Sequence, residues 1–251
     1  MAAPSPPPRF PRALAAAGRE VGAFFRQALL VRHDLTDSVL PPANKVVEDV
    51  VVFLHGMLAS AGVLRPLRAG VERHAGVHAA ALTYPPGPGV VEIATRLEAL
   101  VRELPAATRV HLVGHSLGGV VARYYAQESG DARIVQTISL ASPFAGVSGA
   151  RLLRFIGIAD LEPHSPVLRR ILLGAERCAH VPHLSIIAAE DQFIPSPRVH
   201  ALPVGDVVVL EGRGHNAILY DDEVVRLVAR RVLELRRPRT AIAGPKGDAA
   251  A

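Results

Sequence analysis

Cysteine and lysine are both scarce in this chain of 251 residues. Cys178 is the single cysteine, which excludes an internal disulfide and a zinc module built on several cysteines. Lys and Arg together number 28, yet only Lys45 and Lys246 are lysines, so arginine carries most of the positive charge. The arginines are scattered among acidic residues, and we therefore expect no nucleic-acid partner. One cluster of arginines lies near the C-terminus and comprises Arg226, Arg230, Arg231, Arg236, Arg237 and Arg239. We interpret it as the solvated end of a helix; the alternative is contact with an anionic membrane or a nucleic acid.

Long uninterrupted apolar runs are also missing. Hydrophobic residues make up 49% of the chain and mean hydropathy is +0.26, which excludes global disorder. No apolar run reaches the roughly 18–20 residues that a transmembrane helix needs. Arg19, Glu20 and Arg26 interrupt the first apolar stretch, where a signal peptide would need an unbroken one. We therefore expect a cytoplasmic protein.

The N-terminal residues 14–31 have the spacing of an amphipathic helix. Leu14, Val21, Phe24, Phe25 and Ala28 lean to one side of it. We expect this side to pack against the rest of the protein; the alternative is peripheral contact with a membrane surface. Residues 1–35 are accordingly assigned to a tail and helix, 36–239 to a single domain, and 240–251 to a flexible tail.

Short β-branched runs alternate with segments of helical spacing through the rest of the chain. This alternation predicts an α/β fold with a mostly parallel, doubly wound sheet and helices on both faces. Helices are expected over 90–104, from Ser116 to a stop at Gly130, and over 222–235. The expected strands are Val46–Leu54, His78–Tyr84, Val110–Gly114, Ile134–Leu140, Leu184–Ala189 and Val207–Leu210.

About 40 residues, from Ser142 to Pro182, interrupt this alternation without a strand signal. Two apolar stretches within them, RLLRFIGIADL and SPVLRRILLG, read as short helices, and a structureless loop of this length would be unusual. We expect a small helical cap insertion at about 142–182. Phe155 and Ile156 are its candidate substrate-binding residues, and burial against the core is the alternative role for its apolar side chains.

The central motif is Gly114-His115-Ser116-Leu117-Gly118, which has the pattern G-x-S-x-G. A buried strand precedes it and a helix follows it, as a nucleophile on a tight strand-to-helix turn requires. At the start of a helix, Ser116 would face backbone N–H groups that favour developing negative charge. Ser116 is therefore the candidate nucleophile, and a glycine-rich helix start with a capping serine is the alternative.

A nucleophilic serine needs a base, and position selects His215 from eleven histidines. It lies in a glycine-rich loop after the last expected strand, at the same sheet edge as Ser116. The orienting acid should follow an earlier strand, and Asp191 does so. Glu190 beside it and Asp160 in the insertion are the alternatives.

Backbone N–H groups are the expected donors to an oxyanion in acyl transfer. One belongs to Leu117, directly after the nucleophile. The other belongs to Met57, where Val51-Val52-Phe53-Leu54 runs into His55-Gly56-Met57. This chemistry needs no cofactor, and we expect no metal site because His and acidic residues do not cluster at ligand spacing.

These motifs resemble the α/β-hydrolase superfamily, and within it the bacterial lipase and esterase branch related to triacylglycerol lipases and to the GPI inositol-deacylase-like group. The resemblance runs from about Val46 to Leu235 and rests on VVFLHGM, GHSLGG, LSIIAAED and GRGHN. It implies an α/β-hydrolase fold, a triad of Ser116, Asp191 and His215, and oxyanion donors at Met57 and Leu117. Ala145-Gly146 departs from the His-Gly that relatives often carry, which loosens the subfamily assignment.

The resulting hypothesis is a serine hydrolase that cleaves carboxylic esters, with a lipid or other small acyl ester as substrate. A thioesterase or an amidase would use the same residues. A non-catalytic binding protein of this fold and a membrane-associated adaptor are the alternatives from other classes. The oligomeric state is unknown from the sequence.

Overall fold

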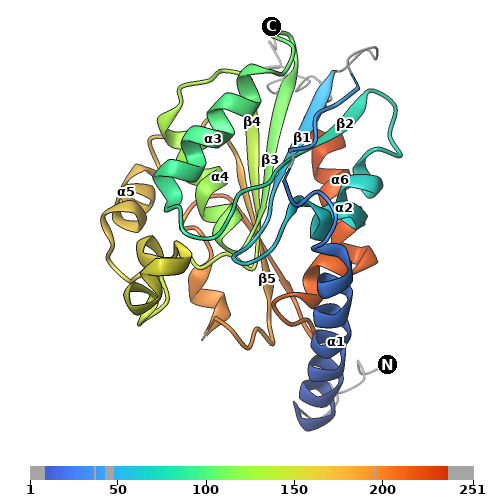
Figure 1. Ribbon diagram of the computed structural model, residues 1–251, viewed down its shortest axis with the longest axis vertical. Coiled ribbons are helices and arrows are strands. Elements are labelled where there is room, and N and C mark those ends of the chain that lie inside the picture. The colour runs from blue at the N-terminus through green and yellow to red at the C-terminus, as the bar shows by residue number, and fades with distance from the viewer. Residues whose placement is uncertain (1–8, 37, 43–47, 195, 237–251) are drawn as a thin grey trace, which may run out of the picture.

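The computed structural model describes residues 9–36, 38–42, 48–194 and 196–236, and its centre is a parallel sheet (Figure 1). The sheet has six strands in the order β2-β1-β3-β4-β5-β6. All six expected strands are present, so the α/β fold prediction is confirmed. The strands are β1 (Asp49–Leu54), β2 (Val77–Leu82), β3 (Arg109–His115), β4 (Ile134–Leu140), β5 (His183–Ala188) and β6 (Asp206–Leu210).

Both faces of the sheet are covered by helices, which explains why its strands are continuous apolar runs. In β1, Val50 and Val52 contribute to the core on one face, while Val51 and Phe53 contribute to the core on the other. Figure 1 shows α3, α4 and α5 on one side of the sheet and α2 and α6 on the other. These helices are α2 (Arg65–Val71), α3 (Val90–Arg102), α4 (Leu117–Glu128), α5 (Pro166–Gly174) and α6 (Asp222–Arg236).

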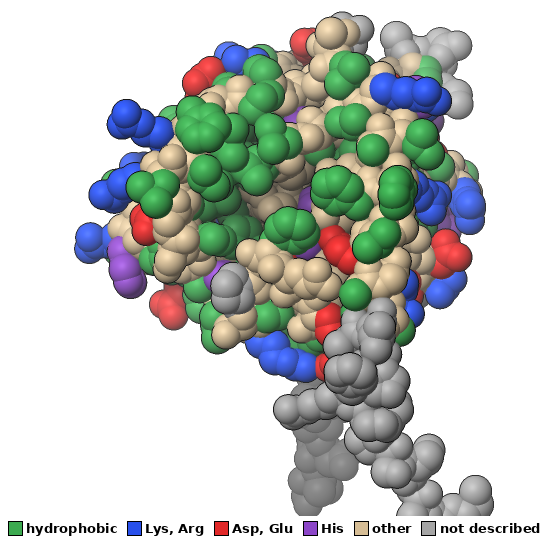
Figure 2. Space-filling model, turned by 60° about the horizontal axis from the view of Figure 1, so that its bottom comes forward, with side chains coloured by type: hydrophobic (Ala, Val, Ile, Leu, Met, Phe, Trp, Pro, Cys, Tyr) green, Lys and Arg blue, Asp and Glu red, His purple; other side chains and the backbone are tan. Residues whose placement is uncertain are grey.

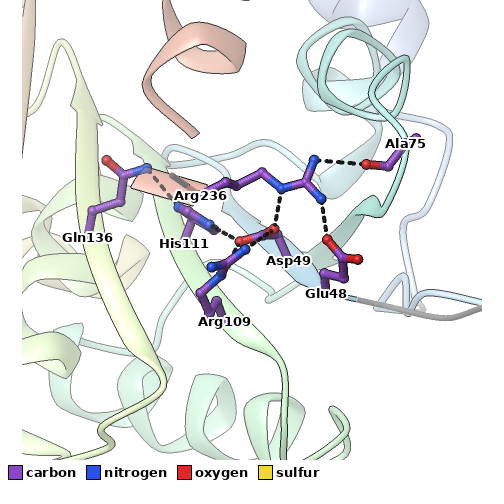
Figure 3. A network of polar contacts seen from close by, with 7 residues as sticks. All are labelled: Glu48, Asp49, Ala75, Arg109, His111, Gln136 and Arg236. Carbon is purple, nitrogen blue, oxygen red and sulfur yellow. Dashed lines mark hydrogen bonds and ion pairs between the residues drawn. The ribbon is translucent and has the colours of Figure 1, made fainter. Parts of the chain in front are cut away.

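The amino edge of the sheet is held by a buried carboxylate (Figure 3). Asp49, at the start of β1, accepts hydrogen bonds of 2.9 Å from both Arg109 and His111. Arg236, at the end of α6, lies 2.8 Å from the same carboxylate. His111 and Arg109 lower the pKa of Asp49 to about 2, against the opposing effect of its burial. The network therefore ties the last helix to the first strand, on the sheet edge opposite the candidate nucleophile.

The N-terminal helix α1 (Arg9–Leu30) packs with the face opposite to the expected one. Ala16, Glu20 and Ala23 are buried, whereas the stripe that includes Phe24 and Phe25 is exposed to solvent. The expectation that this stripe packs against the domain is therefore wrong. The helix contacts two short 3₁₀ helices, η1 (Ala61–Leu64) and η5 (Ala217–Tyr220). Within the described residues, no helix is long and apolar enough to cross a membrane.

The segment from Ser142 to Pro182, between β4 and β5, is helical in the structure. Its base is anchored by Arg123 of α4, which is fully buried and donates to the carbonyls of Ala175, Cys178 and Val181. A buried guanidinium that donates to three carbonyls fixes the returning chain against α4. The segment comprises the 3₁₀ helices η2 (Ala150–Ile156) and η3 (Ala159–Leu161), followed by α5.

Candidate active site

Ser116 sits on a strained turn between β3 and α4. Its φ of 53° and ψ of −120° are a conformation that a residue with a Cβ rarely adopts. The glycines of the motif make the turn possible: a Cβ at Gly114 would lie 2.2 Å from the Gly118 carbonyl oxygen, and one at Gly118 would lie 2.4 Å from the Leu54 oxygen. The strand, the turn and the helix therefore approach too closely for side chains at these two positions.

The loop after β1 lies directly beside Ser116. A Cβ built on Gly56 would be 3.3 Å from the Ser116 Cβ. The next residue, Met57, therefore also lies close to Ser116. Leu117 is the first residue of α4, so its N–H has no partner one turn earlier within the helix. The two candidate oxyanion donors thus flank the serine on separate elements.

His55 shapes this loop as a neutral side chain. Its Nε2 accepts from the backbone N–H of Tyr84 at 3.2 Å, so its Nδ1 carries the proton and donates to the Gly56 carbonyl at 2.7 Å. The Tyr84 hydroxyl donates to the His55 carbonyl, and the two rings stack with centroids 3.9 Å apart. Burial lowers the pKa of His55 to about 4. It therefore holds the loop of Met57 and does not titrate near neutral pH.

His215 and Asp191 are joined by a hydrogen bond, with 2.6 Å between Nδ1 of the imidazole and Oδ2 of the carboxylate. The Asp191 side chain is 1% exposed, and its other oxygen accepts from the backbone N–H groups of Phe193 and Ile194 at 2.9 Å. The carboxylate is thus fixed on both oxygens. Its bond to Nδ1 leaves Nε2 of His215 as the free ring nitrogen.

The two alternative acids have other partners. Glu190 accepts a hydrogen bond from the backbone N–H of Gly212. Asp160 accepts from Val90 at 2.8 Å, where it caps the N-terminus of α3. Neither carboxylate contacts the imidazole of His215, so geometry favours Asp191.

His115, the residue before Ser116, is a contact that the sequence reasoning missed. Its Nε2 donates to the backbone carbonyl of His215 at 2.9 Å, and the two rings lie 4.8 Å apart between centroids. Burial lowers the pKa of His115 to about 3, so the ring is neutral. This bond brings the loop of His215 against the turn of Ser116. Between the Ser116 hydroxyl and the His215 ring themselves, both of which the structure describes, no hydrogen bond is formed; such bonds often tighten only with substrate.

Glu20 of α1 is a second missed contact. It is 6% exposed and accepts from the backbone N–H groups of Asn216 and Ala217 at 2.9 and 3.0 Å, and from the Asn216 side-chain amide at 2.8 Å. A Cβ on Gly214 would lie 2.4 Å from this carboxylate. The sequence shows that Glu20 is the single acid of α1 and lies on the same helical side as Ala16 and Ala23, but it does not identify the partner of this carboxylate.

A narrow pocket opens beside the two candidate oxyanion residues. It is lined by Met57, Leu117, Tyr84 and Ile93, and by Ile156 from the insertion. Ile156 therefore reaches the site. Phe155 points elsewhere, with 72% of its surface exposed and no part in the pocket lining.

The architecture is that of known α/β-hydrolases. A lipase from Bacillus licheniformis in a propeptide form has a TM-score of 0.61 at 14% identity, over 78% of this chain and 53% of that one. Est1E from Butyrivibrio proteoclasticus, bound to ferulic acid, has a TM-score of 0.55 at 16% identity, over 80% and 92%. An esterase from Pyrobaculum calidifontis has a TM-score of 0.55 at 14% identity, over 90% and 92%. No curated protein matches the chain.

The fold defines the chain as an α/β-hydrolase. The family model of palmitoyl protein thioesterases matches residues 50–177, about half of the chain, and these include Ser116, Met57 and Leu117. The chain therefore belongs to the palmitoyl protein thioesterase family. Asp191 and His215 lie beyond the matched residues.

Proposed function

We propose that the protein is a serine hydrolase that cleaves fatty-acyl esters through a covalent acyl-enzyme. The observation that carries the proposal is the 2.6 Å bond between His215 and Asp191, on a loop that His115 holds against the turn of Ser116. A buried carboxylate on Nδ1 is the arrangement that makes a neutral imidazole a base at Nε2.

In the first half of the reaction, Ser116 Oγ attacks the carbonyl carbon of the acyl group. His215 Nε2 takes the hydroxyl proton, and Asp191 stabilises the imidazolium without taking a proton itself. The N–H groups of Met57 and Leu117 donate to the oxyanion of the tetrahedral intermediate. Collapse of this intermediate breaks the bond to the leaving oxygen, which takes the proton from His215.

In the second half, water replaces the leaving group. His215 removes a proton from water, whose oxygen attacks the acyl carbon of the Ser116 ester. The second tetrahedral intermediate releases the fatty acid, and the proton returns to Ser116 Oγ. The cycle conserves protons and uses no redox partner.

A thioester is the second candidate substrate, and the family assignment favours it. The steps are the same except that a thiolate leaves, and a thiolate needs less help from a general acid than an alkoxide does. The apolar side chains of Ile93, Leu117 and Ile156 beside the candidate oxyanion residues support an apolar acyl group for either substrate.

The test is hydrolysis of matched oxygen esters and thioesters of one fatty acid by wild-type protein and by Ser116→Ala. The proposal predicts turnover of at least one series and its loss in the variant, which keeps the fold because the side chain is small. Ser129→Ala, at the other end of α4, is the matched control and should keep full activity. Activity that survives in Ser116→Ala would contradict the proposal.

A further inference from the structure

The exposed side of α1 is an apolar stripe that nothing in the described structure covers. Val21, Phe24, Phe25 and Leu29 are 58%, 61%, 71% and 61% exposed. Their spacing of three, four and eight residues places them on one side of the helix. Folded proteins seldom expose such a stripe unless it contacts something.

A second exposed apolar group lies across the candidate site, on the insertion. Leu152, Phe155 and Leu173 are 83%, 72% and 71% exposed. Figure 2, in which the lower end of Figure 1 is turned forward, shows hydrophobic side chains on both sides of a hollow in which histidine is visible. Two further exposed apolar side chains, Leu58 and Phe193, lie on loops near the candidate site and are 58% and 55% exposed. We call the α1 stripe and the insertion group together the apolar rim.

Exposed arginines lie on both parts of the apolar rim, with Glu162, which accepts from the backbone N–H of Arg151, as an acid beside η2. The acid of α1, Glu20, is buried, whereas Arg19 and Arg26 are exposed. In η2, Arg151 and Arg154 are exposed and the segment has no acid. Aromatic and aliphatic side chains flanked by arginine match the interface of an anionic bilayer, where rings enter the acyl boundary and guanidinium groups meet phosphates.

We infer that the apolar rim docks the protein on an anionic phospholipid surface, with the mouth of the candidate site facing the lipid. The helix lies in the plane of the interface and does not cross it, in agreement with its polar and small-residue inner side. Docking in this orientation delivers an acyl chain from the bilayer to Ser116 without passage through water. The inference deepens the proposed function by naming where the acyl substrate resides.

The test measures binding, not activity, and uses Ser116→Ala protein so that a failure of the proposed chemistry does not affect it. The protein is floated with vesicles of phosphatidylcholine alone and of phosphatidylcholine mixed with phosphatidylglycerol. We expect binding to the mixed vesicles that salt weakens. Adding Phe24→Ser and Phe25→Ser should reduce it about tenfold or more, because two ring insertions are lost.

Val207→Ser is the matched control, because Val207 is 49% exposed near the start of β6, toward the sheet edge opposite the candidate site. It should bind as the parent protein does, and unfolding temperatures should agree among all three proteins. No binding by the parent, or undiminished binding after the two serine changes, would overturn the inference. So would a dimer that these changes dissociate, since the stripe would then be a contact between copies.

A separate observation concerns the inner side of α1. The Glu20 carboxylate takes three N–H donors from the two residues that follow His215, and Arg19 donates to the Gly212 carbonyl at 2.8 Å on the other side of the loop. The glycines at 212 and 214 leave room for this approach, since a Cβ at either position would meet Arg19 or Glu20. The helix α1 thus forms hydrogen bonds to the His215 loop on both sides of His215.

We propose that Glu20 is a positioning residue that holds His215 in register with Asp191. The proposal rests on the catalytic role proposed for His215. In Glu20→Gln the side chain has one accepting oxygen in place of two, and its NH₂ group faces N–H donors. The His215 loop therefore loses part of its hydrogen bonding to α1. We expect kcat to fall about tenfold or more while KM stays within about twofold.

The readout that separates positioning from stability is the low-field proton resonance of the His215–Asp191 hydrogen bond. It should shift or broaden in Glu20→Gln well below the unfolding temperature, and stay in place in Ser116→Ala. Glu48→Gln, which removes a carboxylate at the far edge of the sheet, is the control and should change neither kcat nor the resonance. An unchanged resonance and an unchanged kcat in Glu20→Gln would overturn the proposal.

Discussion

Ser116 has a backbone conformation that costs of the order of 1–3 kcal/mol, and the surrounding contacts impose it. Its N–H donates to the Leu140 carbonyl at 2.9 Å, and glycines two residues away on either side admit the close packing. A serine held in this way projects from the sheet edge with its hydroxyl free for chemistry.

The acid can be assigned by one pair of variants. Asp191→Asn keeps the shape but offers an amide to Nδ1 of His215, which favours the wrong tautomer, so kcat should fall by orders of magnitude, about 10⁴-fold in a comparable triad. Glu190→Gln disturbs only the contact to Gly212 and should leave kcat within a few-fold. Steady-state kinetics on one soluble ester distinguishes the two, and the reverse ranking would move the acid by one residue.

The residue-level predictions from sequence depended on strand ends. Asp191 and His215 follow β5 and β6, and parallel strands end at one edge, so their proximity could be predicted. The contacts of His115 and Glu20 could not, because they join β3 and α1 to residues 100 and 196 positions further along the chain. No local pattern specifies such a pairing.

Among the elements, those with a strong local pattern were predictable. The buried strands are continuous apolar runs, and α6 begins with Asp222 and Glu223 at its positive end. The helix α2 was not anticipated, because RPLRAGV contains Pro and Gly and is held by packing on α6 and β2.

The reversed packing of α1 has a related cause. Apolar periodicity predicts that Val21, Phe24 and Phe25 are buried, yet the structure buries Ala16, Glu20 and Ala23. Small residues let the helix approach closely, and Glu20 supplies the acceptor for the N–H groups of Asn216 and Ala217.

The position of the insertion leads to a prediction about the preferred length of the substrate's acyl chain. Ile156 lines the pocket and Phe155 does not, so Ile156→Ala should reduce kcat/KM for longer acyl chains more than for short ones. At about 0.8 kcal/mol for each buried CH₂, losing the burial of about two such groups lowers kcat/KM by the order of tenfold. The measurement uses monodisperse p-nitrophenyl esters of increasing length.

Phe155→Ala is the matched control for this series and should leave the chain-length profile unchanged. A uniform loss across all lengths in Ile156→Ala, together with a lower unfolding temperature, would show that Ile156 only packs against the core.

At the scale of the whole molecule, buried neutral histidines make the fold sensitive to acid. Burial lowers the pKa of His55 to about 4 and those of His115 and His183 to about 3. In the unfolded chain these groups take up protons near pH 6.5, whereas in the folded chain they do not. Their stabilising contribution is therefore present above pH 6.5 and is lost progressively as pH falls from there toward the folded pKa values of about 3 to 4.

We expect the free energy of unfolding to fall by a few kcal/mol between pH 7 and pH 5.5, at up to about 1.4 kcal/mol per pH unit for each histidine. Urea denaturation at a series of pH values measures this slope. His183→Gln removes one of the titrating groups and should flatten it. A free energy of unfolding that is constant over this interval would contradict the pKa directions.

Acylation of Ser116 is the step on which the proposed mechanism depends, and the mass of the protein after exposure to a fluorophosphonate reports the reactivity of this serine directly. We expect one covalent adduct, located by peptide mapping to Ser116, formed much more slowly in His215→Ala and not at all in Ser116→Ala. An adduct on another residue, or none in a folded wild-type protein, would contradict it.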